Sequence, residues 1–408
     1  MLHIAIAIGL LLGLLVGLAA AATGNEWLLA IAQGVEPLGR IFMNAIRMVV
    51  IPLVVVIIFS SIAKLGNPRT LGKIGGLTFG YYAVTLFPAI VVGMAVMKFG
   101  LQFAADITVP TNEPPTVPQL RGFVDFLVSL IPPNPFAAAN AGAMLPLIVF
   151  TALVAAAAGT IEASRRDRLI QFADDASAAL IKLVWWILYL APIGVFGLVA
   201  PVTATLGWDL ITSLVIFILC VAAGLLIYTF AVMLPLVWLL ARIAPAKFLR
   251  GTFGALSITV SSTSTAVALP VTREETHKNL GVSRTVTDLL IPFTASTYRP
   301  GTALFQGASI VFLAYLFDVP VPVAVLGGAV LATFLVSLTV APVPSSGVVT
   351  MAPALEAAGV PGSGLAILLG IDRIPDMMRS GVNVLGHIST AAIVDRFVDV
   401  DDVNNVES

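Results

Sequence analysis

The chain has 408 residues, of which 59% are hydrophobic and 11% are charged. Its mean hydropathy of +1.03 excludes an ordinary soluble domain, because so few polar side chains cannot cover the surface of a chain of this length. The 21 basic and 22 acidic side chains nearly cancel, so we expect no nucleic-acid partner. The single cysteine, Cys220, excludes an internal disulfide and a cysteine metal cluster.

Apolar runs long enough to cross a membrane recur through the first 241 residues. A membrane helix needs about 20 mostly apolar residues. This criterion marks six spans, at 3–22, 41–63, 74–99, 143–160, 178–204 and 209–241. The first span has no basic region before it, so we interpret it as a retained helix rather than a cleaved signal.

From about residue 248 the apolar stretches are interrupted by clusters of Ser, Thr, Gly and Pro. The clearest are SITVSSTSTAVALP, YRPGT and TVAPVPSSG. Broken segments at membrane depth are tolerated only where they line a cavity or lie inside protein. The interruptions therefore predict a binding site near the middle of the bilayer.

The basic residues predict how these broken segments are oriented. Clusters at 64–73, 165–168 and 242–250 fall in alternate loops, which places those loops in the cytoplasm. The next basic cluster, at 273–284, is also cytoplasmic by charge, so the apolar stretch before it predicts a helical hairpin that turns at Ser261 to Pro270. A second hairpin is predicted within 320–360, which contains no Lys or Arg. We expect it to enter from the outside, with its tip near Val343 to Gly347.

The last span carries five polar residues on one helix face. They are separated by four, three, four and four positions: Asp372, Asp376, Arg379, Asn383 and His387. A charge at the bilayer centre costs at least about 2.5–3.5 kcal/mol, so such groups usually serve a function. A guanidinium suits a carboxylate and a nearby aspartate suits an ammonium, which together predict an acidic amino acid as ligand. The alternative is an internal ion pair of Asp376 with Arg379 that only stabilises the fold.

The two hairpin tips supply hydroxyls and free backbone N–H groups. Both SSTSTA and PVPSSG place them at broken helix ends, where the helix dipole favours anions. A single run of this kind could equally serve helix packing by small residues. Two such runs in opposed hairpins favour a role in binding.

Taken together, these motifs resemble the glutamate transporter family, the dicarboxylate/amino acid:cation symporters. The resemblance covers nearly the whole chain and rests on MVVIPLVVVIIFSSIA, SSTSTAVALPVT, GTALFQG, VPSSG and LGIDRIPDMMRSGVNVLGH. It implies an all-α membrane protein with eight transmembrane helices and two opposed re-entrant hairpins. It also implies a homotrimer in which a transport domain slides past a fixed scaffold as an elevator.

The same resemblance divides the chain into segments. Residues 1–73 would form the first two helices, mainly scaffold, and 100–207 the scaffold and trimerisation helices four and five. The third helix, 74–99, would join the transport domain in 208–398, and 399–408 would be an acidic cytoplasmic tail. Within 208–398 the resemblance implies helix six, hairpin 1 at 248–279, helix seven at 282–316, hairpin 2 at 320–357 and helix eight at 363–398.

Residue roles follow from the resemblance in the same way. Arg379 would bind the substrate's side-chain carboxylate, Asp376 its amino group and Asn383 its main-chain carboxylate. Thr302 would add a hydroxyl, and Ser380 keeps a hydroxyl where the family usually has Thr. The tips would close over the ligand through four residues: Ser264, Thr265, Val343 and Gly347.

The departures from the family pattern concern sodium. The family's Asn-Met-Asp-Gly-Thr signature reads here Tyr298, Arg299, Pro300, Gly301, Thr302, and His387 replaces the last sodium-liganding Asp. Of three further sodium-site residues, Tyr82 and Thr85 persist but Leu86 replaces Ser. Sodium wants several oxygen ligands, so we expect no metal site and no cofactor.

We expect Arg299 to take over the electrostatic role of bound sodium, opposite Asp372, Asp376 or the substrate. The alternative is that it only packs or reaches away from the membrane core. Coupling would then come from a proton or from exchange, and two residues could carry the proton. They are His387, which titrates near neutrality, and Asp376, if burial raises its pKa. A neutral, hydrogen-bonding His387 remains equally open.

The sequence thus predicts a secondary transporter of glutamate, aspartate or related dicarboxylates, not an enzyme, in the inner membrane with both termini cytoplasmic. Its partners would be the small acidic substrate, the bilayer and two further copies of the chain. Two alternatives remain open at this stage. One is a sodium-coupled symporter with remodelled sites, and the other is an uncoupled anion channel or sensor on the same fold.

Overall fold

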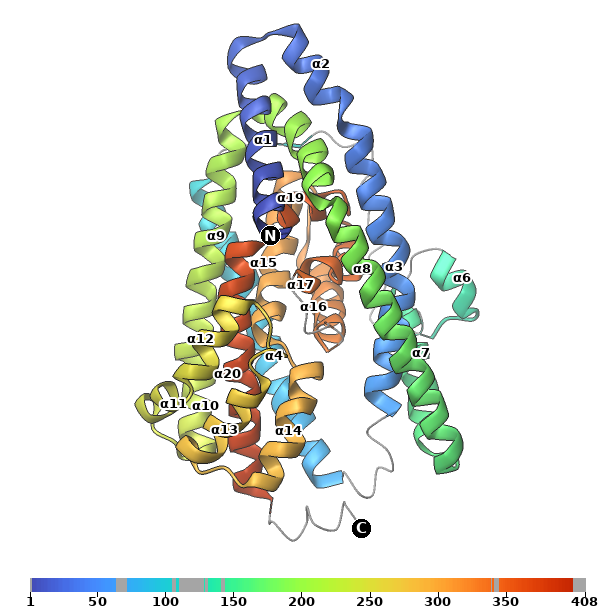
Figure 1. Ribbon diagram of the computed structural model, residues 1–408, viewed down its shortest axis with the longest axis vertical. Coiled ribbons are helices and arrows are strands. Elements are labelled where there is room, and N and C mark those ends of the chain that lie inside the picture. Colours follow the sequence, from blue (N-terminus) through green and yellow to red (C-terminus); the bar gives the residue numbers. More distant parts are fainter. Residues whose placement is uncertain are drawn as a thin grey trace.

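The computed structural model describes residues 2–63, 72–104, 108–109, 128, 131–140, 144–338, 340 and 345–398. Every regular element in these ranges is a helix, as expected for an all-α membrane protein. Figure 1 shows that the longest helices run roughly along the long axis of the molecule. The described helices sort by their packing into two groups.

The first group comes from the N-terminal half of the chain. Here α1 and α3 pack along the length of α8, and α7 packs on α3. A Cβ atom on Gly9 of α1 would lie 2.1 Å from the carbonyl oxygen of Pro192 in α8, so glycine is what lets the two helices approach this closely. The group comprises α1 (Leu2–Thr23), α2 (Glu26–Gly34), α3 (Glu36–Ala63), α6 (Pro135–Asn140), α7 (Met144–Gly159) and α8 (Ala163–Leu206).

The second group joins α4 (Gly72–Gly100) to the C-terminal half. In it, α4 packs against α15 and α9, while α20 packs against α12, α14 and α15. A Cβ atom on Gly93 of α4 would lie 2.2 Å from the carbonyl oxygen of Leu304 in α15. Its main long helices are α9 (Trp208–Tyr228), α14 (Arg284–Thr297), α15 (Pro300–Leu316) and α20 (Arg373–Phe397).

Short and broken elements fill the rest of this group. After α9 the chain continues through two π-helical turns, Thr229–Met233 and Val237–Ala241, with α10 (Leu234–Leu236) between them. The remaining elements are the 3₁₀ turn Leu101–Phe103, α11 (Pro245–Gly251), α12 (Phe253–Ser262), α13 (Leu269–Leu280), α16 (Val323–Ser337), α17 (Ser346–Val349), α18 (Ala352–Ala357) and α19 (Gly364–Ile371).

This group contains two helix pairs and two helix breaks. In the first pair, α12 and α13 pack together and are joined by residues 263–268, which we call the 263–268 turn. In the second pair, α16 packs on α18, and we count with this pair Ser345 and the short helix α17, which lie between α16 and α18 in the chain. The segments expected as helix seven and helix eight are both broken, the first at Tyr298–Arg299 between α14 and α15 and the second at Asp372 between α19 and α20. We keep the names helix seven and helix eight for these two segments. The broken ends therefore lie within the helical core, where the sequence placed its interrupted segments.

Three described stretches are long and apolar enough to cross a membrane: Ile74–Phe103, Tyr189–Leu206 and Trp208–Ala241. Shorter apolar helices accompany them, including Ile8–Thr23, Val149–Gly159 and Val325–Ser337. These stretches fall at or within spans predicted from hydropathy, except that the last belongs to the second helix pair.

Helix boundaries differ from the hydropathy prediction in two places. The expected span 178–204 is only the C-terminal part of α8, which begins at Ala163. Its first turns, ASRRDRLIQFADD, are charged but contain good helix formers, so a hydropathy window cannot detect them. The short helix α2 was also not predicted. Asn25 caps it by accepting hydrogen bonds from the N–H groups of Trp27 and Leu28.

Candidate substrate site

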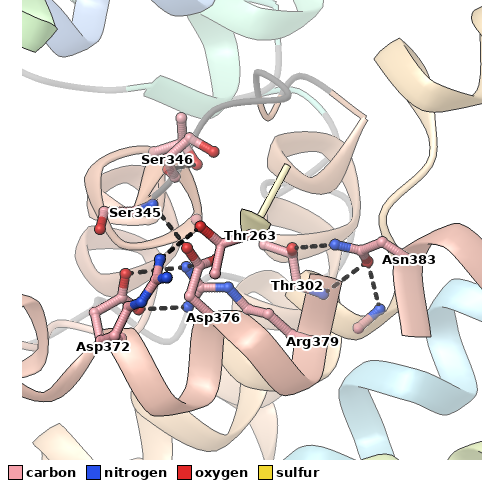
Figure 2. A network of polar contacts seen from close by, with 12 residues as sticks. Thr263, Thr302, Ser345, Ser346, Asp372, Asp376, Arg379 and Asn383 are labelled. Atoms are coloured by element: carbon pink, nitrogen blue, oxygen red, sulfur yellow. Dashed lines mark hydrogen bonds and ion pairs between the residues drawn. The ribbon is translucent and has the colours of Figure 1, made fainter. Parts of the chain in front are cut away.

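The polar face of α20 is organised around Arg379. Its Nη1 donates to Asp372 Oδ1 at 2.6 Å and its Nη2 to Asp372 Oδ2 at 3.2 Å, which is a bidentate pair. The same Nη2 lies 2.8 Å from Asp376 Oδ1. All three side chains are buried, with exposed fractions of 1%, 1% and 7%. The helix spacing thus brings both aspartates to one guanidinium, as Figure 2 shows.

Other groups close around this guanidinium. The Arg379 Cζ lies 4.3 Å from the centre of the Phe305 ring, within reach of a cation–π interaction. A Cβ atom on Gly347 of α17 would lie 3.3 Å from the same Cζ and 2.7 Å from a methyl carbon of Thr302. Only glycine allows α17 to come this close. Among the described residues Arg379 is enclosed, with only 1% of its side chain exposed.

The second helix pair also contacts the aspartates. The backbone N–H of Ser345 donates to Asp376 Oδ2 at 3.2 Å. Ser345 has a φ of +60°, a left-handed conformation that is uncommon for a residue other than glycine, and it directly precedes α17. The predicted contact residue Val343 lies outside the described residues. The pair thus meets the charged cluster through backbone, as anion-binding helix ends do.

Asn383 lies one helical turn beyond Arg379 and caps another helix. Its Oδ1 accepts hydrogen bonds from the backbone N–H of Gly301 at 2.9 Å and of Thr302 at 3.2 Å, and its Nδ2 donates to Thr302 Oγ1 at 3.0 Å. The first N–H groups of a helix have no acceptor within the helix and need one from outside. Pro300, the first residue of α15, has no N–H, so Gly301 and Thr302 carry the first N–H groups of α15. The structure therefore joins two predicted site residues, and the second N–H of the Asn383 amide has no acceptor among the described residues.

Arg299 is buried at the break in helix seven, and its partners are neutral. Its Nε donates to the carbonyl oxygen of Val340 at 2.7 Å, and its Nη2 donates to the carbonyl oxygen of Ala295 at 2.8 Å and to Thr265 Oγ1 at 3.3 Å. The Ala295 carbonyl lies in the last turn of α14, where a positive charge is favoured, whereas Val340 lies beyond the end of α16. Among the described residues, no carboxylate lies within ion-pair distance of Arg299. The expectation that Arg299 compensates the charge of Asp372, Asp376 or the substrate stays a prediction.

Tyr298, beside Arg299, is part of a buried aromatic and hydroxyl cluster. Its ring stacks on that of Tyr82, with centroids 4.3 Å apart and an angle of 6° between planes. Its hydroxyl lies 2.6 Å from Thr85 Oγ1. Because the Thr85 hydroxyl already donates to the carbonyl of Tyr81, Tyr298 is the donor. Tyr82 in turn contacts Thr297 Oγ1 at 3.0 Å.

His387 ends the polar face and is also buried, with 1% exposed. Its Nε2 lies 2.9 Å from the carbonyl oxygen of Tyr298. A carbonyl only accepts, so Nε2 carries the hydrogen. This carbonyl belongs to the peptide unit that leads into Arg299. His387 thus interacts with the break between α14 and α15. A neutral and a protonated imidazole both donate from Nε2, so the two predicted roles of His387 stay predictions.

Three further predicted residues have less direct contacts. Thr265, 2% exposed, reaches Arg299 but no carboxylate in the described contacts. Ser264 lies half-buried in the 263–268 turn, and Ser380 is buried beside Arg379 in α20. The structure thus brings Arg379, Asp372 and Asp376 into one cluster, and Thr265 of the serine-rich turn contacts Arg299.

One buried residue with contacts at this site was not singled out from the sequence. Gln306 of α15 donates from Nε2 to the carbonyl oxygen of Gly347 at 2.9 Å, and its Oε1 accepts from Ser337 Oγ at 3.3 Å. It thereby joins α15 to both arms of the second helix pair. The only available signal was its place in the GTALFQG motif.

Comparison with known proteins now decides the family. The family model described as the sodium:dicarboxylate symporter family matches residues 2–397. The chain belongs to this family. Its members are transporters, so the apolar helices described above are those of a membrane transport protein.

Individual relatives can be aligned with this chain over almost its full length. The chain is 29% identical to the proton/sodium-glutamate symport protein of Geobacillus stearothermophilus, over 95% of this chain and 92% of that protein. It is 26% identical to the proton/glutamate-aspartate symporter of Escherichia coli strain K12, over 94% and 90%. It is 28% identical to the C4-dicarboxylate transport protein of Bacillus subtilis strain 168, over 98% and 94%.

Proposed function

We propose that this family member is a secondary transporter of acidic amino acids or C4-dicarboxylates that works without sodium. Arg379 would bind the substrate's distal carboxylate, Asp376 an amino group where the substrate has one, and Asn383 the other carboxylate. Thr302 and Ser380 would add hydroxyls. The 263–268 turn and the segment around Gly347 would close over the substrate. The relatives' names, glutamate, aspartate and C4-dicarboxylate, support this substrate class.

The observation that carries the proposal is the buried cluster of Arg379 with two aspartates. A guanidinium held by two carboxylates can exchange one of them for a substrate carboxylate without losing its charge partner. The aspartate released in this way becomes free to bind an ammonium group. An apolar or cationic solute would gain nothing from this exchange, so the cluster favours dicarboxylic substrates.

Charge balance supports proton coupling. Asp372, Asp376, Arg379 and Arg299 carry formal charges that sum to zero, and all four are buried. An acidic amino acid adds a net charge of −1, which is costly in a buried site unless a cation enters with it. A proton taken up by one of the aspartates or by the substrate would restore neutrality. Exchange of one acidic solute for another would satisfy the same requirement.

The contacts of Tyr298 and Arg299 favour sodium independence. Two backbone carbonyl oxygens and a threonine hydroxyl are the kind of oxygens that bind a hard cation, and here they hold the guanidinium of Arg299. Tyr298 fills the neighbouring space with a ring, and its hydroxyl is engaged with Thr85. We infer that Arg299 acts as a built-in cation in place of bound sodium.

Other features of the proposal come from the family resemblance. They are an inner-membrane location with both termini in the cytoplasm, eight transmembrane helices with two re-entrant hairpins, a homotrimer, and an elevator motion. The first group of helices would be the scaffold. The second, which includes α4 and the charged cluster, would be the moving transport domain.

Uptake into proteoliposomes tests the proposal directly. Purified protein is reconstituted, and uptake of radiolabelled glutamate, aspartate and succinate is measured with sodium fully replaced by choline. We expect saturable uptake and counterflow in choline, increased by an inward proton gradient. A strict requirement for sodium would leave the remodelled sodium symporter as the better description. Flux of anions that does not saturate would indicate a channel.

A further inference from the structure

Arg373, the first residue of α20, contacts the serine-rich turn of the first helix pair. Its Nη1 donates to Thr263 Oγ1 at 2.8 Å and its Nη2 to the carbonyl oxygen of Ser261 at 3.4 Å. Ser261 lies in the last turn of α12, whose carbonyl oxygens have no partner within the helix. Arg373 therefore caps α12 from a helix more than a hundred residues away in the chain.

Thr263 adopts an unfavourable backbone conformation at this contact. Its φ is +55°, in the left-handed region that a β-branched residue rarely enters. Its side chain is 3% exposed, and its N–H bonds the carbonyl of Thr259 to end α12. Such a conformation persists only when neighbouring contacts hold it. Arg373 is a contact to Thr263 that comes from outside the helix pair.

A second guanidinium holds the other side of the same turn. Arg299 donates to Thr265 Oγ1, two residues after Thr263. The turn is thus held on one side by helix eight and on the other by the break in helix seven. Arg299 is buried and donates to two backbone carbonyls as well as to Thr265, whereas Arg373 is half-buried and, among the described residues, donates only to α12 and the turn. Arg373 is the contact that can be released more easily.

The position of Arg373 ties this contact to the charged cluster. It directly follows Asp372, which accepts both bonds of the bidentate pair from Arg379. Asp372 is the junction between α19 and α20. Figure 2 draws Thr263 together with Asp372, Asp376 and Arg379. A shift of Asp372 away from Arg379 would move the backbone that also carries Arg373.

We propose that Arg373 is a positioning residue that latches the 263–268 turn over the substrate site and controls how readily the site opens. The proposal rests on the proposed function, in which a substrate carboxylate competes with Asp372 for Arg379. Displacement of Asp372 at the α19–α20 junction then alters the latch. Arg373 itself does not contact the substrate, so it sets opening and affinity but not substrate choice.

Hydrogen–deuterium exchange tests the latch without any transported solute. Amide exchange of segment 259–268 is measured in lipid nanodiscs for the wild type, Arg373→Ala, Arg373→Lys and Thr263→Val. A hydrogen bond from a charged donor commonly changes an equilibrium by about tenfold or more. We expect exchange to rise by about tenfold in Arg373→Ala and Thr263→Val, and by less in Arg373→Lys.

The controls separate the latch from general destabilisation. Arg284→Ala removes an exposed arginine that pairs with Glu274 and Asp288 near the far end of α13, and it should leave exchange in 259–268 unchanged. Amide exchange of 259–268 in the double variant Arg373→Ala/Thr263→Val should not exceed that in either single variant, because both substitutions remove the same interaction. Wild-type exchange in Arg373→Ala, or additive effects in the double variant, would overturn the proposal.

Transport kinetics supply the second readout. In Arg373→Ala we expect the KM for the transported acid to rise about tenfold while the maximal rate is kept or increased, with partial recovery in Arg373→Lys. The ranking of substrates should not change. An unaltered KM would overturn the latch. If no acidic solute is transported by the wild type, the proposed function fails while the exchange experiment still decides the contact.

Discussion

The protein buries two arginines in the same group of helices, and their partners differ. Arg379 is held by the carboxylates of Asp372 and Asp376, whereas Arg299 is held by two backbone carbonyls and a hydroxyl. A carboxylate on a side chain can move away and be replaced by another anion. Backbone carbonyl oxygens are held by the fold and cannot leave in this way. The contrast supports our proposal of one exchangeable anion site and one fixed cation.

The largest effect should follow from removing the exchangeable site. Arg379→Gln leaves Asp372 and Asp376 without their partner and removes the donor for the substrate carboxylate. Truncating one member of such a buried pair costs about 2–5 kcal/mol, so we expect uptake of acidic substrates to fall by about a hundredfold or more. Initial rates in proteoliposomes measure this.

A matched double variant separates binding from folding. Arg379→Gln/Asp372→Asn removes a positive and a negative charge together and so avoids an additional unpaired carboxylate. It should restore the thermal unfolding midpoint in detergent toward that of the wild type, yet acidic uptake should stay lost. Recovery of uptake in this variant would show that Arg379 is a structural ion-pair partner rather than a ligand.

The second effect concerns the fixed charge. Arg299→Met should reduce transport by at least about tenfold, because the carbonyls of Ala295 and Val340 lose their donor and the charge balance of the site changes by one unit. It should not create sodium dependence, since neither Tyr298 nor Pro300 offers a free ligand oxygen. Uptake is compared in sodium and in choline.

Arg299→Lys is the control for this variant. It keeps the positive charge but not the fork geometry, so we expect partial activity that is equal in sodium and in choline. Sodium-dependent uptake in Arg299→Met would break the contrast between the two arginines, because the carbonyl oxygens would then serve a mobile cation.

The charged face of α20 could be predicted because helix geometry alone brings residues three and four positions apart together. The sequence suggested an ion pair between Arg379 and Asp376. The structure shows this pair and also a bidentate pair between Arg379 and Asp372, two turns away. Contacts between segments far apart in the chain could not be predicted from the sequence. The carbonyls around Arg299 and the contact of Gln306 with Gly347 involve backbone atoms. Because backbone atoms are the same in every residue, no residue type marks these contacts.

The same limit applies to Tyr298. The loss of an amide ligand at this position is visible in the sequence, but the stacking on Tyr82 is not. Hydropathy located the apolar helices because burial in lipid constrains composition over whole turns. It missed the charged start of α8, because a helix rich in good helix formers can form in water without an apolar sequence.

The smallest effect tests where the proton is carried. His387 is buried, donates from Nε2 to the carbonyl of Tyr298 and is joined through that peptide to Arg299. A second positive charge beside a fixed guanidinium is disfavoured at low dielectric. We therefore expect His387→Gln, whose amide can also donate to that carbonyl, to change the response of uptake to an imposed proton gradient by less than about twofold. Asp376→Asn, measured with a dicarboxylate that carries no amino group, should abolish that response while exchange persists. The opposite result, a lost response in His387→Gln alone, would identify the imidazole as the proton carrier. It would also mean that Arg299 disfavours a positive charge on His387 less than we expect.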